Sequence, residues 1–485
     1  MMSERYRPAA PGTAWIINNL DVVSPYGRRE LHAIKPADSV SHLENSFNEI
    51  TLTAAILDKH KSFSSETKTV FRSIRDIRGT VSGLENDFVL DETELFEIKQ
   101  FAINSERVRE ICNAAGFAIE TCRLNSLKEL ISLLNPDQTI VPSFYLHESY
   151  SENLAQIRTR KRELEARILS EKDQQKKEAL RNQRAAIVAE ENEEEFKVRR
   201  MLSQKLEMHI SDLNTCITAL GKLELLLART EIAQRWPSCR PKIMHQNEAE
   251  KISLKNALNP EIAEILKQQS KSFTPVTIEL KRGITMLTGA NMGGKTVALL
   301  TTAMNIELAS LGFFAFAEEL CMPVLDFISI NGGDGQNHQA GLSSFGAEII
   351  ALNDLSPKIR SGCGLAVFDE FARSTNPFEG RRFVQALCDF LKNSSSFGIV
   401  ATHYDGISLH GSDHYQVVGL RQRFNEKCSS GSSDRQRSLQ HLCESMDYHL
   451  IKIDGPYEVP KDALNIAVLL ETDNEFIEIL KKYYD

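Results

Sequence analysis

Residues 284–296 read Ile-Thr-Met-Leu-Thr-Gly-Ala-Asn-Met-Gly-Gly-Lys-Thr, and this stretch decides the fold of the second half of the chain. The apolar run 284–287 precedes Gly289, and a run with helical spacing, 297–308, follows Thr296. Residues 289–296 fit the pattern G-x-x-x-x-G-K-[ST] in the strand–loop–helix context that the pattern requires. The sequence therefore predicts a phosphate-binding loop, and this context argues against a chance glycine-rich turn.

The chemistry of such a loop assigns a role to each residue type. Glycines let backbone N–H groups wrap around phosphates, and the N-terminus of the following helix adds partial positive charge. Lys295 is expected to hold the β- and γ-phosphates of ATP, and the Thr296 hydroxyl to ligate Mg²⁺. The predicted nucleotide-binding residues of this loop are Gly289, Asn291, Met292, Gly293, Gly294, Lys295 and Thr296.

A second motif, residues 364–370, is an apolar run that ends in two carboxylates. Asp369 occupies the position that supports a Mg²⁺ ion, and Glu370 the position of a general base that orients the attacking water. An acidic strand end that faces solvent is the alternative. The order of the motif, after a phosphate-binding loop, favours the catalytic interpretation.

Two further segments complete the candidate site. Thr402-His403 follows the apolar run 399–401, and the end of a strand in such a sheet lies near bound nucleotide. His403 could sense the γ-phosphate or position water, although a single histidine is more often structural. Residues 341–348 carry small residues that lead into a helix, so Ser343 could reach a phosphate. A simple N-capped helix explains that segment equally well.

The hydrophobic pattern predicts the architecture. Short apolar runs at 284–287, 324–330, 365–368 and 399–401 alternate with helical segments, which indicates an α/β domain with a mainly parallel sheet. Residues 29–134 have helical spacing, and residues 91–99 resemble a helix start with acidic residues in the first turn. We expect an α/β P-loop ATPase domain, preceded by an all-α region and a coiled-coil arm.

Four segments are expected along the chain. They are a helical lever region at 1–150, an arm with returning helices at 151–236, a connector at 237–272, and the ATPase domain with C-terminal dimerisation helices at 273–485. The arm rests on apolar residues at 3–4 spacing within a charged stretch. The charge pattern alone favours a solvated helix surface over an arm that grips a partner.

Composition limits the remaining classes. Hydrophobic residues make up 42% and charged residues 25% of the 485, which is ordinary globular usage. No window holds the roughly 20 apolar residues of a membrane span, and residues 1–12 do not read as a signal peptide, so we expect a cytoplasmic protein with no membrane partner. The nine cysteines include no C-x-x-C pair, which argues against a disulfide framework or a zinc site. The net charge of -9 does not itself support nucleic-acid binding.

Together these motifs resemble the MutS family. Residues 288–296 resemble its T-G-x-N-M-G-G-K-[ST] loop, and residues 369–380 its D-E-x-x-R-G-T-x-x-x-[DE]-G segment. Residues 343–348 are similar to the S-T-F-x-x-E signature, which contacts nucleotide across a dimer, and Thr402-His403 to the switch histidine. The resemblance implies a P-loop ATPase domain of the MutS or ABC type preceded by an all-α lever region. It also implies a homodimer or heterodimer with composite ATP sites, and helical levers moved by ATP binding and hydrolysis. Leu342, Ser344 and Ser374 depart from the family pattern.

Within that family, two functions are open. We expect no mismatch-reading domain before Ser24, a short arm, and no nuclease-like segment after the ATPase motifs. With residues 460–467 (Pro-Lys-Asp-Ala-Leu-Asn-Ile-Ala), this plan is similar to the ATPase subunits of reactivases for lysine 5,6-aminomutase, an adenosylcobalamin enzyme. That resemblance implies a remodelling ATPase that exchanges damaged cofactor. The alternative is a DNA-structure or mismatch-binding ATPase that holds duplex or branched DNA with the basic cluster Arg158, Arg160, Lys161 and Arg162.

Overall fold

The computed structural model describes residues 6–136, 146–289, 294–332, 344–407, 412–420, 446–455, 467 and 472–483. The chain forms two compact units. The α/β unit contains Met1–Leu20, Ile34–Asn48 and Glu231–Asp485, and the helical unit contains Asp21–Ala33 and Glu49–Thr230. Segments of the two units alternate along the chain, whereas the sequence pattern predicts four consecutive segments. Within the described ranges, no helix is both long and apolar enough to cross a membrane.

The helical unit agrees with the helical pattern predicted for the first half of the chain. Its elements are α2 (Pro25–His32), α4 (Phe63–Phe71), α5 (Arg78–Glu85), α6 (Glu92–Ala114), η1 (Glu120–Cys122), α7 (Lys128–Leu134), η2 (Glu148–Tyr150), α8 (Glu152–Ser170) and α9 (Gln174–Glu207). Two more helices, α3 (Val40–Lys59) and α10 (Ile210–Arg235), continue from one unit into the other.

Helix α6 begins where the acidic sequence pattern predicts a start. The Asp91 side chain accepts from the Glu94 backbone N–H at 2.8 Å, and the Glu94 side chain accepts from the Asp91 N–H at 2.9 Å. This reciprocal capping box satisfies two backbone donors that a helix start otherwise leaves unpaired.

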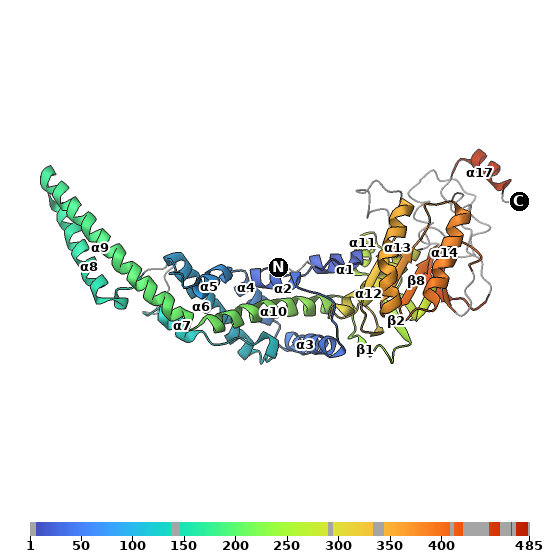
Figure 1. The fold of residues 1–485 in the computed structure, drawn as a ribbon, viewed down its shortest axis with the longest axis horizontal. Helices are drawn as coiled ribbons and strands as arrows, with labels where there is room; N and C mark the ends of the chain where they lie inside the picture. Colours follow the sequence, from blue (N-terminus) through green and yellow to red (C-terminus); the bar gives the residue numbers. More distant parts are fainter. Residues whose placement is uncertain are drawn as a thin grey trace. The chain divides into compact units, whose positions relative to one another are not determined.

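The charged stretch after residue 151 forms two helices, α8 and α9, that pack alongside each other (Figure 1). Leu154, Ile157 and Leu164 are buried, as their 3–4 spacing requires. Charges on the two helices pair with one another: Arg158 lies 3.1 Å from Glu191, and Arg160 2.8 Å from Glu190. Arg158 and Glu191 are buried, whereas Arg160 and Glu190 remain about half exposed, so this stretch combines a solvated surface with ion pairs between the two helices.

The α/β unit contains two sheets. The larger has the order β10-β9-β4-β8-β7-β6, parallel except for the antiparallel β10–β9 pair, and the smaller has the order β1-β5-β2-β3 with mixed directions. The strands are β1 (Lys242–Met244), β2 (Lys251–Ala257), β3 (Val276–Lys281), β4 (Gly283–Thr288), β5 (Glu319–Pro323), β6 (Ile328–Asn331), β7 (Leu365–Asp369), β8 (Phe397–Ala401), β9 (Asp413–Leu420) and β10 (Met446–Lys452). The helices are α1 (Pro11–Asn18), α11 (Pro260–Gln268), α12 (Lys295–Ser310), α13 (Ser344–Ser361), α14 (Pro377–Lys392) and α17 (Asn474–Lys481).

Burial explains the position of these strands. Every residue of β4 and β8 is buried, which is typical of central strands in a parallel sheet covered on both faces. Helix α12 packs against strands of both sheets. The α/β class with mixed sheets is therefore confirmed. The segment 237–272 was expected to be a connector, but it contains β1, β2 and α11. Strand β2 belongs to the smaller sheet, where alternate residues of its first half are buried against neighbouring strands.

Helix α12 also fixes the N-terminal segment of the chain. Its buried Glu307 accepts hydrogen bonds from the Ala9 N–H at 2.6 Å, the Ala10 N–H at 2.9 Å and the Tyr6 hydroxyl at 2.6 Å. Helix α1, which begins at the next residue, packs on α12. A single carboxylate at the far end of the P-loop helix therefore anchors the start of α1.

We expect Glu307→Ala to lower the free energy of unfolding of the α/β unit by about 2–4 kcal/mol, because buried donors lose their acceptor at about 1–3 kcal/mol each. Urea denaturation followed by circular dichroism and by fluorescence of Trp15, which lies on α1, measures the change. The control is Glu318→Ala, which removes an exposed carboxylate paired with Lys255 and should cost at most about 1 kcal/mol. Equal losses in the two variants would contradict the anchoring role.

Candidate nucleotide-binding site

The connection between β4 and α12 has the geometry of a phosphate-binding loop at both ends. Gly289 follows β4 with φ 146° and Gly294 precedes α12 with φ 91°, conformations that residues with a side chain rarely adopt. A Cβ atom on Gly294 would lie 2.8 Å from the Tyr448 ring, so glycine also leaves the space that this contact needs. The predicted residues Asn291, Met292 and Gly293 lie outside the described residues.

Lys295 is the first residue of α12 and its side chain is buried. The ammonium group donates to the Gly289 carbonyl oxygen at 2.6 Å. Burial lowers the pKa of Lys295, and the nearby carboxylates of Glu370 and Asp369 oppose that shift. The Lys295 ammonium group therefore lies beside Gly289, at the start of the loop, where bound phosphates would offset the cost of burying its charge.

Thr296, the next residue, connects the loop to β7. Its hydroxyl donates to Asp369 Oδ2 at 2.8 Å. Asp369 Oδ1 is buried and has no hydrogen-bond partner among the described residues. Burial raises the pKa of Asp369, and the hydrogen bond from Thr296 opposes that rise. An uncompensated carboxylate oxygen beside a hydroxyl is an arrangement that a divalent cation would satisfy.

The donor set around Asp369 fits Mg²⁺ in particular. In the described part of the chain, no three His, Cys, Asp or Glu side chains gather closely enough to hold a metal ion by themselves. Mg²⁺ usually takes one or two protein oxygens and completes its shell with water and substrate phosphates. Thr296 and Asp369 supply two such oxygens.

Glu370 follows Asp369 at the end of β7. Its N–H donates to the Ala401 carbonyl of β8 at 3.0 Å, and its carboxylate accepts from Arg373 Nη1 at 2.7 Å and lies 3.7 Å from His403 Nδ1. The His403 contact is too long for a good hydrogen bond, so we treat it as electrostatic. His403 lowers the pKa of Glu370, and Arg373 adds to this effect while burial opposes it. Glu370 is therefore a carboxylate at neutral pH and can accept a hydrogen bond from water.

The structure brings together most of the predicted site residues that it describes. Gly289, Lys295, Thr296, Asp369, Glu370 and His403 meet at the C-terminal ends of β4, β7 and β8. Ser343 lies outside the described residues. Sequence reasoning assigned no role to Arg373, Glu348 or Tyr404. Arg373 pairs with Glu370, and the other two hold the loop after β7. The available signals were two motifs, residues 369–380 for Arg373 and residues 343–348 for Glu348.

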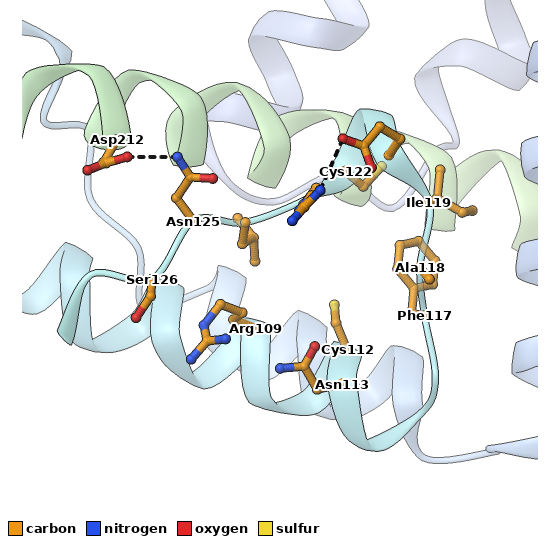
Figure 2. Close-up of a pocket in the computed structure, with 13 residues that line it drawn as sticks. Arg109, Cys112, Asn113, Phe117, Ala118, Ile119, Cys122, Asn125, Ser126 and Asp212 are labelled. Carbon is orange, nitrogen blue, oxygen red and sulfur yellow. Dashed lines mark hydrogen bonds and ion pairs between the residues drawn. The ribbon is translucent and has the colours of Figure 1, made fainter.

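A separate cavity of about 650 Å³ lies in the helical unit and contains none of these residues. Figure 2 shows Arg109 and Cys112 on one helix, Asp212 on another, and residues 117–126 between them. Arg109 is paired with Glu106 at 2.8 Å, and Asn125 donates to Asp212 at 2.7 Å. These lining groups already have protein partners, and we assign the cavity no chemistry.

A parallel sheet that presents a P-loop lysine, a threonine–aspartate pair and a glutamate at one edge defines an α/β domain of the P-loop ATPase type. Residues 285–453 match the family model of MutS domain V. That range contains the last four residues of β4, the P-loop, and strands β5 to β10.

Named relatives agree with this match. The DNA mismatch repair protein MutS of Streptococcus mutans is 25% identical over 291 residues, which is 58% of this chain and 32% of that protein. The endonucleases MutS2 of Lactobacillus acidophilus and Thermus thermophilus are each 28% identical, over 52% and 51% of this chain and 31% of each relative. These similarities support a MutS-family protein. The aligned part spans about a third of the length of these relatives.

Proposed function

We propose that this chain binds and hydrolyses ATP in a Mg²⁺-dependent reaction. The observation that carries the proposal is the meeting of Lys295, the Thr296–Asp369 pair and the ionised Glu370 at one edge of a parallel sheet. Each group is of the type needed to bind phosphate, support a metal ion or orient water.

The residues divide the work according to their surroundings. Lys295 exchanges its bond to the Gly289 carbonyl for phosphate oxygens, which are stronger acceptors because they are charged. Thr296 and Asp369 hold Mg²⁺, which supplies charge that stabilises the phosphates. Glu370 accepts a hydrogen bond from the attacking water, and His403 and Arg373 keep it ionised and oriented.

We further propose that the site works in a homodimer or heterodimer, with Ser343 of one subunit contacting nucleotide held by the other. The observations that support this are the match to MutS domain V and the S-S-F-x-x-E sequence at residues 343–348. The helical unit would then act as the lever region, with α8 and α9 as its arm. ATP binding and hydrolysis would move these helices.

For the partner, DNA is the better-supported proposal. The Streptococcus mutans relative is named a DNA mismatch repair protein, and MutS2 relatives are named endonucleases. The basic cluster at residues 158–162 is a poor candidate for the contact, however. Its four cations, Arg158, Arg160, Lys161 and Arg162, each pair with a glutamate of the helical unit. We propose that the DNA contact lies elsewhere on the chain.

Replacing Glu370 with Gln should reduce kcat for ATP hydrolysis by about 10²- to 10⁴-fold, since the acceptor for the water proton is lost. ATP affinity should stay within about threefold, because the phosphate-binding residues are intact. Steady-state phosphate release and equilibrium nucleotide binding measure the two quantities. Glu318→Gln is the control, since that exposed carboxylate pairs with Lys255. Unchanged turnover in Glu370→Gln would refute the assignment of the base.

The ATPase rate measured with candidate partners tests the DNA proposal. We expect duplex or branched DNA to raise the rate at low salt, and the effect to fall steeply as salt rises, because backbone contacts release counterions. A purified cobalamin-dependent lysine 5,6-aminomutase is the second arm. Stimulation by the aminomutase alone would overturn the DNA proposal and support the reactivase function, for which the sequence feature at residues 460–466 lies outside the described part of the chain.

A further inference from the structure

The loop after β7 holds two residues with side chains in the left-handed backbone region. Glu370 has φ 52° and Ala372 has φ 62°. Left-handed backbone at residues other than glycine carries a conformational cost and persists only where surrounding contacts hold it. The direction of the Glu370 side chain therefore depends on the contacts that hold this loop in its conformation.

The peptide groups of Ala372 are held by two other elements. Its N–H donates to Glu348 Oε2 of α13 at 2.6 Å, and its carbonyl accepts from the Tyr404 hydroxyl at 3.3 Å. Ala372 is completely buried and Tyr404 nearly so. Tyr404 follows His403 directly, so the segment after β8 contacts both Glu370 and the loop behind it.

Helix α14 packs against the contact between Tyr404 and Ala372. A Cβ atom on Gly380 would lie 2.8 Å from the Ala372 carbonyl oxygen and would collide with the Tyr404 hydroxyl. Glycine at this position lets α14 pack directly on the Tyr404–Ala372 contact. The loop is therefore confined between α13, α14 and the end of β8.

The carboxylate of Glu348 has no other strong partner in the described part of the chain. Its second oxygen lies 3.5 Å from the Ser374 hydroxyl, at the limit of a hydrogen bond. Burial raises the pKa of Glu348, and the bond from the Ala372 N–H opposes the rise. The Glu348 side chain is partly buried, and its strong hydrogen bond in the described part of the chain is to the backbone of Ala372, two residues after Glu370.

We propose that Glu348 is a positioning residue for ATP hydrolysis: by holding the Ala372 N–H it fixes the left-handed loop and so aims Glu370 at the attacking water. Glu348 lies in the second turn of α13, so a displacement of that helix changes the aim of Glu370 without moving Lys295 or Thr296. Glu348 thus couples α13 to the chemical step and leaves nucleotide binding unaffected. This inference rests on the proposed ATPase function.

Single-turnover ATP hydrolysis by the full-length chain, with protein in excess over ATP, tests the role. Glu348→Ala should lower the rate on the order of 10- to 100-fold, as expected for a misplaced catalytic group. The Kd for ATP should stay within about threefold. Glu348→Gln keeps an oxygen that accepts from the Ala372 N–H, so it should recover most of the rate. Asp354→Ala, an exposed carboxylate further along α13, is the matched control and should behave as wild type.

Tyr404→Phe gives an independent check, because it removes the hydroxyl bond to the Ala372 carbonyl and keeps the ring. We expect Tyr404→Phe to lower the single-turnover rate by a smaller factor than Glu348→Ala does. In the double variant Glu348→Ala/Tyr404→Phe, the fold-loss of rate should be less than the product of the two single fold-losses, since both side chains hold Ala372.

An unchanged single-turnover rate in Glu348→Ala would overturn the proposal while leaving the ATPase function intact. A loss of ATP affinity equal to the loss of rate, or no recovery in Glu348→Gln, would show a merely structural role and would also overturn it. If the wild-type chain hydrolyses no ATP, the proposed function fails first and the role of Glu348 fails with it.

Discussion

The hydrogen bond between the Thr296 hydroxyl and Asp369 is the interaction on which the candidate site depends. It joins the first turn of α12 to the end of β7, although β8 lies between β7 and β4 in the sheet. Because parallel strands end at one edge of the sheet, Lys295 lies near Asp369 and Glu370, although about 75 residues separate it from them in the sequence. The burial that positions Asp369 also raises its pKa and leaves one oxygen unpaired. We propose that a divalent cation satisfies this oxygen when nucleotide binds.

Local sequence patterns predicted much of the fold. The apolar runs 284–287, 365–368 and 399–401 lie within β4, β7 and β8, because buried parallel strands require continuous apolar sequence. The run 324–330 overlaps β6 only at its end. Strands β1 and β2 were missed, since β1 has only three residues and β2 becomes a strand through its pairing with β5 and β3. The interleaving of the two units also escaped prediction, because it depends on contacts such as that of Glu307 with residues nearly 300 positions away.

Sequence motifs indicated the residues that we propose act on phosphate, metal and water, since these roles demand particular side chains at fixed spacing. They gave no role to Tyr404, and none to the Glu348 carboxylate although Glu348 lies within the 343–348 motif. Both side chains hold the backbone of Ala372, whose left-handed conformation no sequence pattern reports. The sequence also offered the basic cluster at residues 158–162 as a contact for DNA. Spacing shows that cations gather there, but only the fold shows the glutamates of α9 and η2 that pair with them.

The central claim is that the loop between β4 and α12 binds ATP through Lys295. Equilibrium titration of the full-length chain with a fluorescent ATP analogue, in the presence of Mg²⁺, tests this most directly. Replacing Lys295 with Ala should weaken binding on the order of 10- to 100-fold, because a charge-assisted bond to phosphate is lost. Lys267→Ala, which removes an exposed cation from α11, should bind as wild type does. Normal affinity in the Lys295 variant would contradict the account.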